Sequence, residues 1–253
     1  MQNIDLAIVI PTLNEQHYIG SLLDSIAKQT VQPKEIVVID AYSKDKTVEE
    51  AKKRRIKLPQ LKVYQIPKST ISRQRNFGVS KTKQEHILFL DADMFFSDSE
   101  TLKTYYEEVL KTKPEIASAF NVPAGHYWKD KVFFTAMNIL FFLSRPIWPM
   151  TTAMNIYIKR EVFEKIGGFD ENIRVGEDFE LVQRCSKRGY KFFFLDQPRL
   201  HTSPRRFEKE GRTKFALKMI KASLQTLLFG YRNITVEYEF GKFDSSQNKS
   251  HKT

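Results

Sequence analysis

The sequence predicts an α/β protein with a mostly parallel, doubly wound central sheet flanked by helices. Its first half contains continuous apolar runs, such as Leu6–Ile10 and Ile36–Ile39, which are typical of strands buried on both faces. A polar loop and a segment with apolar residues at helical spacing follow each run. This alternation is typical of parallel sheets, in which helices connect successive strands.

The first half holds two clear strand-loop-helix units. After the strand at 6–10, helical spacing is seen in Ile19, Leu22, Leu23 and Ile26. The strand at 36–39 ends in Asp40 and precedes a charged helix that runs to about Arg55. The remaining elements of this half are a strand at Leu61–Ile66, a strand at Ile87–Leu90 and a helix at Leu102–Leu110.

The second half is less regular. We expect strands at 116–122, 154–158 and 190–195, and helices at 161–166 and 178–187 with a break at Gly167-Gly168. From Arg199 to Lys221, eight basic residues stand against two acidic ones, and apolar residues at helical spacing continue to Leu228. The predicted organisation is a main domain over 1–205 with halves at about 1–98 and 99–205, a basic amphipathic helical appendage over 206–243, and a disordered tail over 244–253.

The amino-acid composition narrows the classes of binding partner and the compartment expected for this protein. The 253 residues include 41 basic and 30 acidic side chains, and the net charge of +11 favours nucleic acid, an acidic membrane or a phosphorylated substrate. The single cysteine, Cys185, excludes an internal disulfide framework, and we interpret it as ordinary helix packing. Because Met1–Asp5 lacks a basic region followed by a long apolar stretch, no secretory signal is evident and we expect a cytoplasmic protein.

The longest apolar stretch, Val132–Leu143, is too short to cross a bilayer, which needs about 20 apolar residues. It is aromatic and is flanked by Lys129, Lys131 and Arg145. It therefore suits peripheral contact with a membrane, as does the basic segment near the C-terminus. The alternative is that this stretch packs on the sheet as part of the core.

Two carboxylates follow the fourth strand directly, in Asp91-Ala92-Asp93. Open α/β sheets bind ligands at the carboxyl ends of their strands, and carboxylates are ligands that hard divalent cations prefer. This motif predicts a site for a metal ion and a diphosphate, with a solvated turn as the alternative.

Other polar loops are expected at the same edge of the sheet. They are Pro11–Glu15, Asp40–Asp45 and, before the fourth strand, Ser72–Asn76. There Asp40 could accept a hydrogen bond from a base or ribose, Arg73 or Arg75 could pair with phosphate, and Asp93 could hold a cation. The alternative is local: Asn14 and Asp45 stand where helix N-caps are wanted. The chain has neither a P-loop nor the Gly-x-Gly-x-x-Gly fingerprint after its first strand.

A second acidic cluster, Glu177-Asp178, precedes a predicted helix. One interpretation is a general base that takes the proton from an attacking hydroxyl. The other is a helix cap that the helix dipole favours. His201, after the last predicted strand, is a candidate metal ligand or a structural histidine.

Six motifs in this order resemble those of the family 2 glycosyltransferases. They are 7–15 (AIVIPTLNE), 36–40 with Ser43 and Asp45, 75–78 (RNFG), 89–93 (FLDAD), 167–171 (GGFDE) and 177–178 (ED), and together they span roughly 6–205. The resemblance implies a GT-A fold, a nucleoside diphosphate sugar as donor, Mn²⁺ or Mg²⁺, and inversion at the anomeric carbon.

Carried over by position, the resemblance assigns roles to individual residues. The nucleotide-sugar set is Pro11, Thr12, Asn14, Glu15, Asp40, Arg73, Arg75, Asp91 and Ala92. Asp93 would bind the metal with His201 as a further ligand, and Asp178 would act as the base beside Glu177. Many family members have an acidic residue directly after the position of Asp40, where this chain has Ala41, so the choice between UDP- and GDP-linked donors stays open.

The predicted function is an inverting, metal-dependent glycosyltransferase of cell-envelope, polysaccharide or glycolipid synthesis. Its acceptor would be a saccharide or a lipid-linked molecule, and it would act in the cytoplasm, with peripheral binding to the inner face of the cell membrane as a further expectation. The alternatives are a nucleotide-sugar-binding protein without turnover and a polyprenyl-phosphate glycosyltransferase. No nucleic-acid partner is expected, because the basic residues gather toward the C-terminus and no recognition motif is evident.

Overall fold

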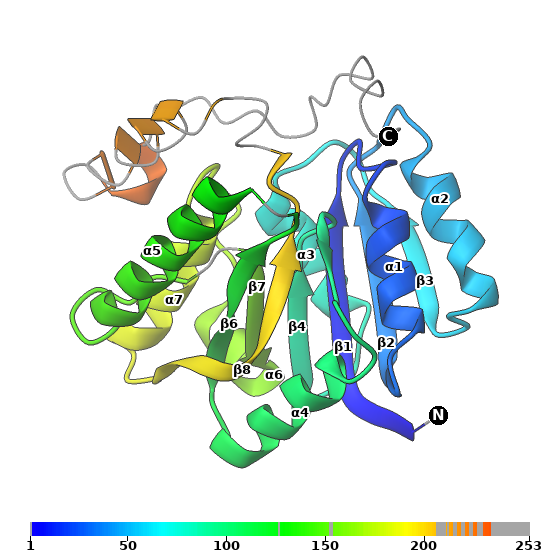
Figure 1. Cartoon of the computed structure of the whole chain (residues 1–253), viewed down its shortest axis with the longest axis horizontal. Helices are drawn as coiled ribbons and strands as arrows, with labels where there is room; N and C mark the ends of the chain where they lie inside the picture. Colours follow the sequence, from blue (N-terminus) through cyan, green and yellow to red (C-terminus); the bar gives the residue numbers. More distant parts are fainter. Residues whose placement is uncertain are drawn as a thin grey trace.

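The computed structural model describes residues 2–125, 127–151 and 154–205, and residues 211, 213–214, 217–218, 221–222, 225–226 and 230–233. Its centre is an eight-stranded sheet in the order β3-β2-β1-β4-β7-β6-β8-β5 (Figure 1). The strands are β1 (Gln2–Thr12), β2 (Val31–Asp40), β3 (Leu61–Gln65), β4 (His86–Leu90), β5 (Met94–Phe95), β6 (Ile116–Pro123), β7 (Asn155–Lys159) and β8 (Phe192–Thr202).

Helices occupy most of the connections between the strands. They are α1 (Ile19–Ala27), α2 (Thr47–Lys53), α3 (Ile71–Ser80), α4 (Thr101–Thr112), α5 (Trp128–Ser144), α6 (Arg160–Ile166) and α7 (Glu177–Lys187), with short 3₁₀ helices η1 (Arg54–Ile56) and η2 (Tyr231–Asn233). The expected strand-helix alternation is confirmed. The last strand is longer than expected and continues to Thr202, so His201 lies within β8.

The two halves of the sheet differ in strand direction. Strands β3, β2, β1 and β4 are mutually parallel, as the sequence predicts. Beyond them β7 runs antiparallel to both β4 and β6, whereas β6 and β8 are parallel. The short strand β5 pairs antiparallel with β8 at the far edge. The carboxyl ends of β1, β2 and β4 thus share one edge, the upper one in Figure 1.

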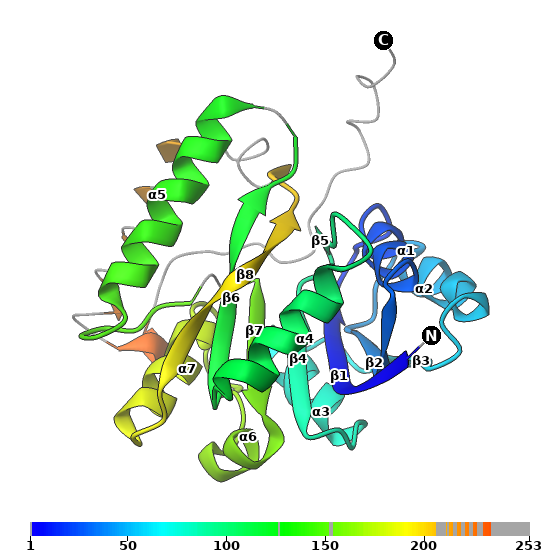
Figure 2. The ribbon, with the colours of Figure 1, turned by 60° about the horizontal axis from the view of Figure 1, so that its bottom comes forward.

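Alternate residues of the strands point to opposite faces of the sheet and pack into two hydrophobic cores. Ile8 and Leu88 face the core that also contains apolar residues of α1 and α4. Val9 and Phe89 face the core that contains residues of α3, α6 and α7, including the buried Cys185. Both faces of the sheet are therefore covered, which explains why the strand sequences are continuously apolar. Figure 2 shows the helices on the two sides.

Helix α5 is only partly buried. Phe134 and Phe141 are buried, but Val132, Ile139 and Leu143 are 54–67% exposed. The aromatic stretch is therefore divided, with part of it packed on the sheet and part facing outward. Among the described residues, no helix combines the length and the apolar character needed to cross a membrane.

The predicted appendage and tail lie mainly outside the described residues, which exclude 206–210 and 234–253. Described positions between 213 and 226 are helical, and Ala222 is buried. In Figures 1 and 2 these fragments lie beside α5 and α7. The proposed domain division stays a prediction.

Candidate functional site

The loops after β1 and β2 meet at the carboxyl edge of the sheet. Thr12 and Asp40, the last residues of these strands, are directly opposite in the parallel register. Asp40 is fully buried and accepts hydrogen bonds from the Thr12 hydroxyl (3.1 Å), the Ser43 amide (2.9 Å) and Gln65 Nε2 (3.4 Å). The carboxylate thus organises the loop that follows β2. Its contact with a base or ribose stays a prediction.

Asn14 connects the same two loops. Its backbone N–H donates to the Ser43 hydroxyl (2.8 Å), and its side-chain Oδ1 accepts from the Lys44 amide (2.9 Å). Its φ of +56° lies in the left-handed region, which Asn tolerates better than most residues. Because Tyr18 occupies the position before α1, Asn14 bridges two loops and does not cap that helix.

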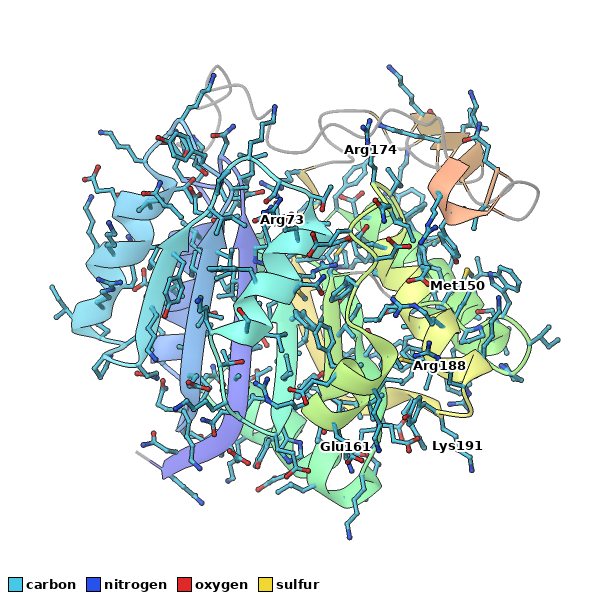
Figure 3. The ribbon with its side chains drawn as sticks, turned by 180° about the vertical axis from the view of Figure 1, so that it is seen from behind. Arg73, Met150, Glu161, Arg174, Arg188 and Lys191 are labelled. Atoms are coloured by element: carbon cyan, nitrogen blue, oxygen red, sulfur yellow. The ribbon has the colours of Figure 1, made fainter. Side chains whose placement is uncertain are left out.

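Other predicted donor-site residues differ in exposure. Pro11, Thr12 and Ala92 are buried at the ends of β1 and β4, whereas Arg73 is exposed on the first turn of α3 (Figure 3). The sequence interpretation missed Gln74, whose Oε1 accepts from the Thr12 amide at 2.9 Å. Gln74 stands inside the Ser72–Asn76 segment, so its place between two arginines was the available signal.

Arg75 joins the two acidic clusters. Its Nη2 donates to Asp91 Oδ1 at 3.0 Å and its Nη1 donates to Glu177 Oε1 at 2.9 Å. The arginine is only 2% exposed. Helix α3 can bring it this deep because Gly78 lies against β1, where an added Cβ would come within 2.4 Å of Val9. The predicted phosphate-binding residue is therefore a buried bridge that joins Asp91 to Glu177, and Glu177 lies 102 positions beyond Arg75 in the sequence.

Glu177 and Asp178 are both buried in the first turn of α7. Gly176 occupies the N-cap position, so neither carboxylate is the capping residue itself. Burial and the neighbouring Asp178 raise the pKa of Glu177 to about 7, although the positive charge of Arg75 opposes this shift. The pair is therefore a carboxylate site that holds or releases a proton near neutral pH. Buried acidic pairs of this kind are frequent at catalytic centres.

A second buried arginine, Arg205, pairs with Asp93, the candidate metal ligand. Arg205 Nε donates to Asp93 Oδ2 at 2.8 Å, and Arg205 Nη2 donates to Glu15 Oε1 at 2.8 Å. Its side chain is 7% exposed. The sequence interpretation missed it because Arg205 is one of eight basic residues in the 199–221 segment, and only the end of β8 brings it to the loops after β1 and β4.

The oxygen atoms of Asp93 and Glu15 suit a divalent cation. They already converge on one positive group, the guanidinium of Arg205, and carboxylate oxygens are the preferred ligands of Mg²⁺ and Mn²⁺. The His201 ring packs against Phe95 in a tilted arrangement with ring centroids 5.3 Å apart, and burial lowers the pKa of His201. Its role as a metal ligand stays a prediction.

Among the described residues, the group of three side chains close enough to share a metal ion is Asp5, Glu85 and His86. His86 is the first residue of β4 and is opposite Leu6 of β1. It therefore lies at the amino end of β4, whereas the loop that contains Asp93 follows the carboxyl end. His86 Nδ1 lies 2.6 Å from the Tyr157 hydroxyl.

The sequence model of the family described as glycosyl transferase family 2 matches residues 7–167. This chain belongs to glycosyl transferase family 2. The matched range includes the loops after β1, β2 and β4 together with Arg75, and it ends before the carboxylate pair of α7. The resemblance to this family is therefore confirmed, and the first four of the six motifs lie within the matched range.

Two relatives illustrate the range of this family. The O-antigen chain rhamnosyltransferase RfbN of Salmonella typhimurium is 27% identical over 203 residues, which cover 74% of this chain and 62% of RfbN. The poly(ribitol-phosphate) beta-N-acetylglucosaminyltransferase TarS of Staphylococcus aureus is 30% identical over 184 residues, which cover 68% of this chain and 30% of TarS. The chain thus spans less than two thirds of the length of each relative.

Solved structures support the fold. Residues 1–349 of S. aureus TarS in complex with UDP-GlcNAc give a TM-score of 0.62 at 23% identity, covering 80% of this chain and 58% of the other. The mannosyltransferase PcManGT of Pyrobaculum calidifontis in complex with GDP-Man and Mn²⁺ gives a TM-score of 0.69 at 21% identity, covering 87% and 64%. The fold is GT-A, as the sequence motifs implied.

Proposed function

We propose that this family 2 protein is an inverting glycosyltransferase that moves a sugar from a nucleoside diphosphate sugar to an acceptor hydroxyl in the synthesis of a cell-envelope polysaccharide or glycolipid. The observation that supports this most strongly is Arg75, which joins Asp91 after β4 to the buried pair on α7. One buried guanidinium thus links a donor-side carboxylate to Glu177, the residue directly before the candidate base Asp178. The named activities of RfbN and TarS agree with this assignment.

The proposed reaction is a single displacement. The acceptor oxygen forms a bond to the anomeric carbon, the bond from that carbon to the diphosphate oxygen breaks, and the nucleoside diphosphate leaves. The acceptor proton goes to Asp178. Attack from the face opposite the leaving group inverts the anomeric centre. Asp178 needs correct placement next to the acceptor, because positioned acid-base catalysis contributes roughly 10²- to 10⁴-fold.

The leaving diphosphate needs positive charge. When bound, a divalent cation supplies Lewis-acid stabilisation of that charge, and Asp93 with Glu15 would hold it, with His201 as a further candidate. Arg205 forms ion pairs with both of these carboxylates. We expect Asp93→Ala to abolish Mn²⁺-dependent donor binding, measured by isothermal calorimetry with and without Mn²⁺. Unchanged binding would remove Asp93 from the metal site.

The acceptor is proposed to be lipid-linked or a saccharide near the inner face of a membrane. The outward residues of α5 support this, because the exposed Trp128, Val132 and Leu143 lie on the same helix as Lys129 and Lys131. An apolar face beside basic side chains is typical of peripheral contact with anionic lipid. The same surface suits a polyprenyl-phosphate acceptor.

The test is a thermal-shift screen of UDP- and GDP-linked sugars with and without Mn²⁺, followed by a hydrolysis assay on each stabilising donor. A ligand that binds only the folded state raises the unfolding temperature, so one stabilising donor identifies base and sugar together. We expect stabilisation and slow hydrolysis that both depend on the metal. Stabilisation without any turnover would favour a non-catalytic nucleotide-sugar-binding protein, and no stabilisation by any donor would contradict the proposal.

A further inference from the structure

The C-terminal segment returns to the candidate base. The Gly230 N–H donates to the Thr226 carbonyl (2.9 Å), and η2 begins at the next residue. The ring of Tyr231 then lies against Gly176, the residue directly before Glu177. A Cβ on Gly176 would be 3.3 Å from the Tyr231 ring, and the φ of Gly176 is +80°. Only glycine meets both requirements comfortably.

An ion pair fixes this contact from the other side. Arg232 donates to Asp170 Oδ2 from Nε (3.0 Å) and from Nη2 (2.7 Å). Asp170 precedes α7 and belongs to the 167–171 motif. Although burial opposes the shift, hydrogen bonds from Arg232 and Asn172 hold the pKa of Asp170 below its usual value. Tyr231 and Arg232 therefore contact the chain on both sides of the loop that leads into the carboxylate pair.

We propose that Tyr231 forms the acceptor-side wall of the active site, held there by the Arg232–Asp170 ion pair, and that it shields Asp178 from bulk water until an acceptor arrives. This inference rests on the proposed function. It gives the C-terminal segment a role in the transfer site, distinct from that of a membrane anchor or a solvated tail. Because the Tyr231 ring lies against Gly176, two residues before Asp178, it is also placed to contact the acceptor.

Electrostatics support the position. Burial, followed by the negative charges of Asp178 and Glu180, raises the pKa of the Tyr231 phenol, while Gln183 acts in the opposite direction. The phenol therefore stays protonated and neutral beside Asp178. A neutral aromatic wall excludes water from a base without removing its charge, which favours transfer to a sugar or lipid hydroxyl over transfer to water.

The first measurement tests docking in the full chain. Hydrogen–deuterium exchange is followed at the amides of residues 176–182 in wild type, Tyr231→Ala and Arg232→Ala. Both variants should exchange faster there, with Tyr231→Ala showing the larger change, because the partly exposed ion pair contributes less than the packed ring. Arg188→Ala is the control, because Arg188 is at the C-terminal end of α7, away from the carboxylate pair at its start. Figure 3 shows Arg188 well separated from Arg174, which precedes the helix. Unchanged exchange in both variants would overturn the docking.

The second measurement tests the shielding. Hydrolysis of UDP-GlcNAc and of GDP-mannose is measured with Mn²⁺; in this reaction a water oxygen replaces the diphosphate at the anomeric carbon and Asp178 receives the proton. Tyr231→Ala should raise kcat for hydrolysis by roughly three- to tenfold with KM for the donor unchanged, because an opened wall admits water. Tyr231→Phe retains the ring, so its kcat for hydrolysis should stay below that of Tyr231→Ala. Arg232→Lys retains the positive charge, so its kcat for hydrolysis should rise less than that of Arg232→Ala.

The outcomes separate this inference from the proposed function. Faster exchange without a rise in hydrolysis would overturn the shielding role while leaving the glycosyltransferase assignment intact. Wild-type protein that hydrolyses neither donor, and no other donor found by the thermal-shift screen, would contradict the proposed function and this inference together.

Discussion

The donor half and the acceptor half of this molecule are built on different physical grounds. At the ends of β1 and β2, hydrogen bonds from Thr12 and Ser43 to the buried Asp40 carboxylate, and from Asn14 to Ser43, link the two loops. On the acceptor side, Arg75 forms a buried ion pair with Glu177. Helix α5 presents exposed apolar side chains outward on this side. The donor loops are thus joined by a hydrogen-bond network in addition to the buried ion pairs of Arg205, whereas the acceptor side combines one buried ion pair with an exposed apolar surface.

The largest expected effect tests the chemical difference between the halves. Asp178→Asn should lower turnover by roughly 10²- to 10⁴-fold, because the acceptor proton loses its base, while donor binding stays intact. Steady-state transfer or hydrolysis and calorimetry of the donor measure the two effects separately. Glu180→Gln is the matched control on the same helix, since Glu180 pairs with Arg184. Normal turnover of Asp178→Asn would assign the base elsewhere.

The Arg75 ion pairs, which join the two halves, should contribute measurably to the free energy of unfolding. Arg75→Met leaves the buried Glu177 and the nearby Asp91 without their shared cation, and loss of one partner of a buried pair typically costs about 3–5 kcal/mol of unfolding free energy. Urea unfolding measures the change. As a control, Arg54→Met removes the more exposed pairs with Asp24 and Glu50 and should cost about 1 kcal/mol or less. Equal losses in the two variants would show that the bridge is no stronger than a surface pair.

The raised pKa of Glu177 gives the acceptor half its own pH dependence. Because its folded pKa is about 7 and its usual value is 4.5, the folded state binds more protons than the unfolded state between these values. This contribution to stability is therefore complete below pH 4.5 and is lost as the pH rises through 7. Urea midpoints across this range should fall with rising pH in wild type, and Glu177→Gln should flatten that slope. An unchanged slope would mean that another group titrates.

The smallest expected effect on turnover and stability comes from substitutions on the outward face of α5, which should change only membrane binding. Ile139→Glu with Leu143→Glu should abolish sedimentation with anionic phosphatidylglycerol vesicles while leaving the fold intact, because both side chains are more than half exposed. Leu110→Glu, an exposed leucine on α4, is the control and should bind as wild type. If wild-type protein fails to sediment at low salt and at high salt alike, the membrane contact is excluded.

Local sequence patterns predicted much of the donor half. Continuous apolar strands, polar loops at their ends and the pair Asp91 and Asp93 identified the sheet and the edge where the site lies. The second half was harder to predict, because β7 runs antiparallel between β4 and β6, and the sequence of a five-residue strand does not indicate its direction. The extension of β8 to Thr202 also escaped, since its polar residues resemble a loop.

The sequence by itself determined the family, the fold class and the candidate carboxylates, because these depend on residue type, spacing and strand periodicity within short segments. Only the tertiary structure decided how the carboxylates are paired. Arg75 meets Glu177 across 102 positions, Arg205 meets Glu15 across 190, and Tyr231 lies against Gly176. Burial and pairing are properties of residues that the folded chain brings together, and a linear sequence records neither.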